Sequence, residues 1–215
     1  MKKALLILIL LVLAGYLLFW PVPVEPVAWD APEAPALEGP YAVNDQLGRV
    51  HRLAAGEGRG PEDVAVDKEG RLYVGYEDGR IVRFRGDGSD ADLIANTGGR
   101  PLGLDFAPDG TLVVADGYQG LLRINAQSGA VTALTKEANG VPFKFTDDVD
   151  VASDGVIYFT DASSKFGPAM KARDDIIEHG GHGRLLKYDP RNDTTTVLLD
   201  GLQFANGVAL APDES

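Results

Sequence analysis

A pattern that occurs four times constrains the fold of this chain more than any other feature of its sequence. Each copy has a short run of alternating apolar residues followed by an acidic turn, and the first three copies continue with a second alternating run. The copies read GPEDVAVDKEGRLYVGY from Gly60, RPLGLDFAPDGTLVVAD from Arg100, FTDDVDVASDGVIYFTD from Phe145 and FANGVALAPDES from Phe204. Two alternating runs joined by such a turn predict a β-hairpin.

The spacing of the copies is typical of a β-propeller. The turn position is Gly70, Gly110 and Gly155 in the first three copies, at intervals of 40 and 45 residues, and Glu214 in the fourth, 59 residues further on. An insertion from about residue 165 to 183 accounts for the long interval. Further apolar strands are expected at 79–84, 120–125, 183–190 and 194–200. Units of about 40 to 45 residues with four short strands are propeller blades. A β-sandwich is the alternative, but sandwiches do not repeat their own sequence.

We therefore expect an all-β fold in which residues 46–215 form the N-terminal part of a propeller, with three blades and the first strand of a fourth. The chain stops at Ala211–Ser215, within a predicted hairpin turn. A propeller closes by packing every blade on two neighbours, so a chain whose outer blades are open would be poorly stable alone. We expect the complete protein to be roughly twice as long.

The N-terminal residues predict a membrane anchor. Residues 4–20 are uncharged and mostly Leu, Ile and Val, which is close to the minimum length for crossing a bilayer. A cleaved signal peptide is the alternative, but the run ends in bulky residues and Trp20 suits the membrane interface. We assign residues 1–20 to a single-pass signal anchor and the proline-rich residues 21–45 to an extended stalk. Lys2 and Lys3 would stay inside, which places the propeller on the non-cytoplasmic side, periplasmic or lumenal.

Composition excludes several classes of function. The net charge of −12 argues against nucleic acid as a partner, because phosphate-binding surfaces need an excess of Lys and Arg. The chain has no cysteine, which excludes disulfide bonds, thiolate metal sites and a cysteine nucleophile. The acidic balance is compatible with a hard cation such as Ca²⁺.

The repeat also predicts where side chains converge. The innermost strand of every blade starts at the same face, near the central channel, so equivalent residues at these starts point at one axis. These axial positions hold Glu62, Leu102, Asp147 and Asn206, and the positions after them hold Asp63, Gly103, Asp148 and Gly207. Oxygen-bearing groups converging from different blades are what Ca²⁺ requires. The alternative is that these residues cap turns or hydrogen-bond the backbone of the channel.

The same segments resemble a known family. Residues 116–125, 145–166 and 183–215, which include GRLLKYDP and NGVALAPD, look like the strictosidine synthase-like proteins of the SMP-30/gluconolactonase superfamily. They are most similar to the branch of the adipocyte plasma membrane-associated protein and its bacterial counterparts, in which a signal anchor also precedes the propeller. The resemblance covers roughly residues 55–215 and implies a six-bladed propeller whose last blades lie beyond this sequence.

This resemblance implies a calcium site and a hydrolase. In the calcium-dependent relatives the ligands include a Glu of the first blade, to which Glu62 corresponds, and an Asn in an NGV motif, to which Asn206 corresponds. Asp147 stands where a second Asn often binds metal or substrate, and a further Asp ligand would lie beyond Ser215. We expect Glu62, Asp147 and Asn206 to hold Ca²⁺. Asp147 or Asp148 would activate water to hydrolyse a small-molecule ester or lactone, such as an aryl ester.

Departures from the family pattern leave other functions open. Leu102 holds the position of the histidine base of paraoxonase-type relatives, and the glutamate base of true strictosidine synthases would lie in a later blade. A non-catalytic binding propeller or scaffold with a structural cation is the main alternative, and an amine–aldehyde condensation is the third. His179 and His182 are interpreted as ordinary loop residues, although insertions at this position cover the channel mouth in the family.

Overall fold

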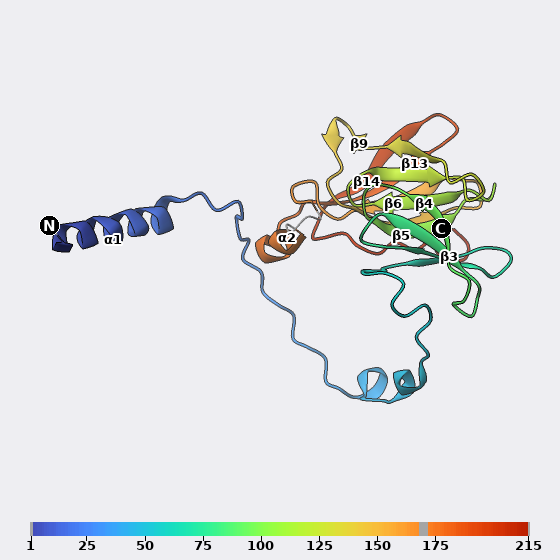
Figure 1. Cartoon of the computed structure of the whole chain (residues 1–215), viewed down its shortest axis with the longest axis horizontal. Helices are drawn as coiled ribbons and strands as arrows, with labels where there is room; N and C mark the ends of the chain where they lie inside the picture. The colour runs from blue at the N-terminus through green and yellow to red at the C-terminus, as the bar shows by residue number, and fades with distance from the viewer. Residues whose placement is uncertain (1, 168–171, 215) are drawn as a thin grey trace.

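The computed structural model describes residues 2–167 and 172–214. An N-terminal helix, α1 (Lys2–Phe19), stands apart from a body of β-sheets in Figure 1. Between them the chain has neither α-helix nor strand, but only two short 3₁₀ turns, η1 (Gly39–Tyr41) and η2 (Gln46–Arg49), within the described range. By length and composition α1 could cross a membrane, although a signal sequence would pass the same test.

The described part of the body contains three four-stranded antiparallel sheets, each formed by consecutive strands in sequence order. The first sheet comprises β1 (Val64–Val66), β2 (Leu72–Gly75), β3 (Arg80–Phe84) and β4 (Asp92–Asn96). The second comprises β5 (Pro101–Phe106), β6 (Leu112–Asp116), β7 (Gly120–Ile124) and β8 (Val131–Thr135). The third comprises β11 (Thr146–Val151), β12 (Ile157–Asp161), β13 (Gly183–Asp189) and β14 (Thr194–Leu202). A small hairpin of β9 (Glu137–Ala138) and β10 (Val141–Pro142) and a short helix, α2 (Ala172–Glu178), complete the described elements.

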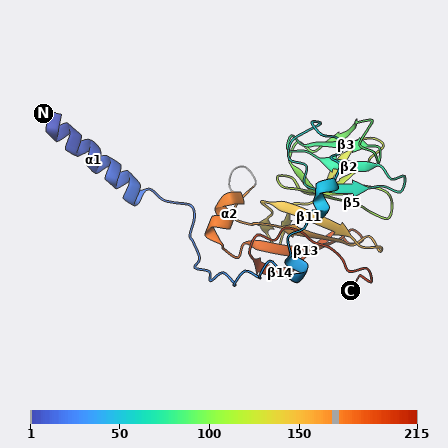
Figure 2. The same ribbon diagram turned by 90° about the horizontal axis from the view of Figure 1, so that it is seen from below.

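The three sheets are arranged as neighbouring propeller blades. The first strands β1 and β5 contact each other, as do β5 and β11, so the blades meet along their inner strands (Figures 1 and 2). The all-β prediction and the expected third strands are confirmed, and β14 confirms the expected fourth strand of the third blade. The sequence did not predict strands β4 and β8. They lie at the outer edges of their sheets, where most side chains are exposed and apolar residues do not alternate clearly.

The hydrophobic core lies between blades. Strand β6 shows how this works, since all five of its residues are buried. Leu112 and Val114 pack into a cluster with the first blade, whereas Val113 and Ala115 pack into a cluster with the third. The two faces of this strand therefore pack against two neighbouring blades, which is why its sequence is a continuous apolar run.

Each inner hairpin turns at the position expected from the repeat. Gly70, Gly110 and Gly155 have φ angles of 75°, 82° and 86°, in the left-handed region that glycine enters without steric cost. Glu214 holds the same position in the fourth copy and also has a positive φ, of 56°. The fourth copy therefore keeps the backbone turn while its residues 205–210 form no described strand.

Aspartates of one inner strand bind backbone N–H groups of the next. Asp63 accepts a hydrogen bond of 2.8 Å from Leu104, and Asp105 accepts one of 2.8 Å from Val151. The third blade uses two such contacts, since Asp148 accepts from Val208 at 2.8 Å and Asp150 from Leu210 at 2.6 Å. We call these four aspartates the inter-blade aspartates. They give polar partners to backbone groups that no sheet hydrogen bond would satisfy.

Replacing Gly103 by alanine is expected to destabilise the protein by about 1–3 kcal/mol, because β5 and β11 approach too closely for a side chain there. An added Cβ would lie 2.7 Å from the Asp148 Cα and 2.9 Å from the Val149 backbone nitrogen, neither of which can rotate away. Chemical denaturation measures the change. Gly48→Ala is the control, because a Cβ at Gly48 meets nothing within 4 Å. Equal stability of the two variants would contradict the close approach.

Candidate functional site

The axial positions meet at one edge of the blades, as the repeat predicts, but with unequal environments. Asp147, at the start of β11, is 3% exposed, and Leu102, at the start of β5, is 1% exposed. Asn206 donates a hydrogen bond from Nδ2 to Asp147 Oδ2 at 2.8 Å, which joins the segment after β14 directly to the third blade. Leu102 packs with Phe145, Ala162 and Phe204, so it contributes an apolar wall beside this pair.

Glu62 interacts with the site in two ways, through an ion pair with Arg100 and through the effect of its negative charge on Asp147. Its carboxylate lies 3.5 Å from Arg100 Nη2, and both side chains are partly exposed. Glu62 also acts on Asp147, whose pKa it helps to raise. The sequence analysis did not predict Arg100 as a residue of this site. The available signal was its place directly before the Pro101 that opens the second inner strand, where its side chain can reach the axis.

Asp147 is the electrostatic centre of the site. Burial raises the pKa of its carboxyl from 3.8 to about 7, and the charges of Glu62 and Asp148 push it in the same direction while Arg100 opposes them. A carboxyl with such a pKa exchanges its proton near neutral pH, which suits a general acid or base. The accumulated negative charge would equally be relieved by a bound cation.

Asp148 is placed differently from Asp147. It is half-buried, and its Oδ2 is occupied by the N–H group of Val208. Its own N–H donates to Thr160 Oγ1 at 3.1 Å, and the Thr160 hydroxyl donates to the Asn206 backbone oxygen at 2.6 Å. Asp148 and Thr160 together hold the fourth inner segment in place. This geometry favours a positioning role for Asp148, and its predicted part in water activation stays a prediction.

The donor set has the chemistry of a hard-cation site but is incomplete as it stands. Glu62, Asp147 and Asn206 offer carboxylate and amide oxygens, which Ca²⁺ prefers, but Ca²⁺ takes about six to eight oxygen ligands. Within residues 2–167 and 172–214, no three histidine, cysteine or acidic side chains converge closely enough to hold a metal by themselves. The residues that could hold a cation here are Asp147, Asn206 and Glu62, and Glu62 would have to leave Arg100 to join the other two.

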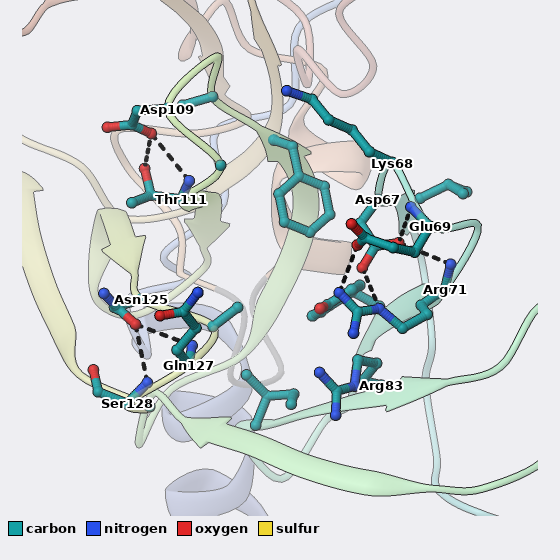
Figure 3. A pocket seen from close by; sticks show the side chains of 18 of the residues that line it. Asp67, Lys68, Glu69, Arg71, Arg83, Asp109, Thr111, Asn125, Gln127 and Ser128 are labelled. Carbon is teal, nitrogen blue, oxygen red and sulfur yellow. Dashed lines mark hydrogen bonds and ion pairs between the residues drawn. The ribbon is translucent and has the colours of Figure 1, made fainter.

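A large groove in the described structure lies elsewhere. It has a volume of about 940 Å³ and is bordered by the β1–β2, β5–β6 and β7–β8 turns (Figure 3). The β5–β6 turn follows the end of the inner strand β5, whereas Asp147 lies near the start of the inner strand β11, so the groove and Asp147 are at opposite ends of the strands. Its polar side chains serve their own turns: Asp67 binds Arg71, Asp109 binds Thr111, and Asn125 accepts from the backbone of Gln127 and Ser128. We interpret it as a groove between two blades.

Stability is expected to fall as pH rises from about 4 to about 7 through the titration of Asp147. Because its folded-state pKa is raised, the folded protein binds a proton that the unfolded chain has already lost in this window. The effect is on the order of a few kcal/mol at most. The measurement is the difference in unfolding free energy between wild type and Asp147→Asn, in chelator, across this range. A difference that does not change with pH would contradict the raised pKa.

Comparison with known proteins assigns the chain to a family. Residues 39–84 match the family described as "Strictosidine synthase-like, N-terminal", and residues 147–215 match "Strictosidine synthase". The chain is 44% identical over 183 residues to protein strictosidine synthase-like 6 of Arabidopsis thaliana, which covers 82% of this chain and 49% of the relative. It is 37% identical over 213 residues to the adipocyte plasma membrane-associated protein of Salmo salar, covering 89% and 50%. The chain thus spans about half the length of these curated relatives.

Solved structures share the fold at lower identity. A gluconolactonase from Xanthomonas campestris superposes with a TM-score of 0.58 at 24% identity, covering 72% of this chain and 52% of that one. The calcium-binding protein regucalcin from Agrobacterium tumefaciens superposes with a TM-score of 0.54 at 15% identity, covering 72% and 48%. The blades, the sequence matches and these neighbours agree. The chain therefore belongs to the strictosidine synthase-like family, in the branch of the adipocyte plasma membrane-associated proteins, and shares its fold with the gluconolactonase.

Proposed function

We propose that this protein is a membrane-anchored, exported hydrolase of ester or lactone bonds that depends on Ca²⁺. The observation that carries the proposal is the hydrogen-bonded pair of the buried Asp147 and the exposed Asn206 at the axis, with Glu62 adding negative charge beside it. The fold neighbours add support, since one is a gluconolactonase and another a calcium-binding protein. The apolar helix α1 and the resemblance to plasma membrane-associated proteins support the anchor.

The residues divide the work as follows. Bound Ca²⁺ would polarise the carbonyl oxygen of the substrate and stabilise the negative charge that develops on it. Asp147 and Asn206 would hold the cation, and Glu62 would join them once it leaves Arg100. Arg100 would then be free to attract the carboxylate of a hydrolysed product. Leu102 and its aromatic neighbours exclude water from one side of the site, which strengthens these electrostatic interactions.

Removing calcium is expected to abolish hydrolysis. The intact protein would be assayed in detergent on aryl esters and lactones, with Ca²⁺ and with EDTA, and as Glu62→Gln and Asn206→Ala. Loss of at least tenfold in both variants is expected, because each removes an oxygen ligand or its charge. Glu137→Gln is the control, since Glu137 is exposed on β9, which belongs to none of the three four-stranded sheets.

The same assay separates the main alternative. If Ca²⁺ raises the melting temperature of wild type but not of Asn206→Ala, and no ester or lactone is hydrolysed, the cation is structural and the protein is a binding propeller. Undiminished hydrolysis in EDTA would reject the metal-dependent mechanism instead.

A further inference from the structure

Helix α2 stands at the same edge of the third blade as the axial site. The chain leaves β12 at Asp161 and returns in β13 at Gly183, and α2 lies between these points. Asp161 pairs in register with both Thr146, the neighbour of Asp147, and Arg184. The insertion that carries α2 therefore rises from the edge where Asp147 lies. A buried hydrogen bond from the Ser163 hydroxyl to Asp175 ties α2 to the end of β12.

The N-terminal segment docks on this insertion. The backbone N–H groups of Glu25 and Val27 donate to the carboxylate and the carbonyl oxygen of Glu178, both at 2.8 Å. The Trp29 ring lies 4.8 Å from the His179 ring, measured between centroids. The stretch from Glu25 to Trp29 is thus held against α2, although the sequence predicts only an extended stalk there.

Glu178 is the joint of this contact. Its buried carboxylate also accepts two hydrogen bonds of 2.8 Å from Lys165 Nζ and lies 2.6 Å from His182 Nε2. Lys165 in turn lies 3.6 Å from the Glu25 carboxylate. The stalk is therefore hydrogen-bonded to Glu178, whose carboxylate is itself held by Lys165 and His182 of the same insertion.

On the outside of this joint, four large apolar side chains are more than half exposed within the described part of the chain. Ile176 and Ile177 on α2 are 59% and 57% exposed, and Val27 and Trp29 on the docked stalk are 54% and 58% exposed. A short helix and a docked loop segment rarely present four large apolar groups to water without a function. Tryptophan beside aliphatic residues is typical of surfaces that rest at a membrane interface.

The chain length between α1 and the joint is short. Five residues, Trp20 to Val24, separate the end of α1 from Glu25. Even fully extended they reach only about 20 Å. If α1 crosses a bilayer, the joint cannot leave the immediate surface of that bilayer. Figures 1 and 2 both show α2 on the side of the blades that faces α1.

We propose that Val27, Trp29, Ile176 and Ile177 form a surface that rests on the lipid bilayer and turns the axial site towards it. This inference rests on the proposed membrane anchor. Its consequence for substrate is that an ester or lactone partitioned into the membrane reaches Asp147 more readily than one in bulk water. The docked stalk would fix the orientation of the propeller relative to the bilayer, whereas a free stalk would let the propeller rotate.

The test places single probes by cysteine substitution, since the chain has no cysteine of its own. Spin labels at Ile177→Cys, Leu93→Cys and Val12→Cys would be compared in the anchored protein, reconstituted in phosphatidylcholine vesicles. Leu93 is the matched control, because it is 64% exposed on β4, towards the opposite end of the strands. Accessibility to oxygen, which concentrates in lipid, and to a water-soluble nickel chelate would be measured at each site.

We expect the label at Ile177 to be severalfold more accessible to oxygen and severalfold less accessible to the nickel chelate than the label at Leu93. The label at Val12, within α1, should report lipid more strongly still. Equal, water-like values at Ile177 and Leu93, with Val12 in lipid, would overturn the membrane-resting surface while the anchor stands. Water-like values at Val12 as well would reject the anchor itself, and with it this inference.

Discussion

Asp161→Ala is expected to destabilise the protein by about 3–5 kcal/mol, the largest effect on stability that the structure suggests. Asp161 is fully buried at the end of β12 and accepts hydrogen bonds from Arg184 Nη2 at 2.6 Å and Nε at 3.2 Å. It also accepts from the backbone of Phe145 at 2.9 Å. Alanine would leave the Arg184 guanidinium buried without its counter-charge, which costs more than the loss of a neutral hydrogen bond.

Asp116 is the matched control for this variant. It occupies the equivalent place at the end of β6, is equally buried, and its Oδ1 accepts backbone hydrogen bonds from Arg100, Tyr118 and Gln119. Among the described residues it has no arginine partner like Arg184, so Asp116→Ala is expected to cost only about 1–3 kcal/mol. Both are measured by chemical denaturation of the intact protein. The double variant Asp161→Ala with Arg184→Met should regain part of the loss. Equal costs for the two single variants would show that the ion pair is not the cause.

Asp147→Asn is expected to lower hydrolytic activity by about 10²–10⁴-fold, because it removes the charge of a proposed cation ligand and, if Asp147 is also the residue that activates water, the general base. The substitution keeps the shape of the side chain and an oxygen that can accept from Asn206 Nδ2, so the pair should remain in contact. It removes the negative charge that the proposed cation and the proposed water activation both require. Activity is measured as kcat and KM on the best ester or lactone, with saturating Ca²⁺.

The stability of the same variant separates loss of function from loss of fold. In chelator at pH 8, Asp147→Asn should be more stable than wild type, because the native protein must ionise a carboxyl whose pKa burial has raised to about 7. Asp148→Asn is the contrasting variant. Asp148 accepts the hydrogen bond of Val208 and is not a proposed cation ligand, so this variant should retain more activity than Asp147→Asn. Full activity of Asp147→Asn would remove Asp147 from the proposed mechanism.

Local features of the fold follow from the sequence because they depend on neighbours in the chain. The hairpin turns at Gly70, Gly110 and Gly155 need a residue that tolerates a positive φ, and the apolar alternation on either side sets which face is buried. The repeat then predicts that Glu62, Asp147 and Asn206 occupy equivalent positions at the starts of inner strands. The structure brings Asp147 and Asn206 into contact. The apolar run at residues 4–20 likewise determines helix α1 by itself.

The tertiary structure alone decided how similar residues differ in role. Asp147 and Asp148 are adjacent and identical in kind, yet one is buried against Asn206 and the other accepts a backbone hydrogen bond from the next inner segment. That difference arises from the distance and angle between blades, which no local pattern encodes. The docking of Glu25 on Glu178 joins residues 153 positions apart, so it too depends on how the blades are packed. The sequence determined where these side chains would gather, and the packing of the blades determined how deeply each is buried and which hydrogen bonds it makes.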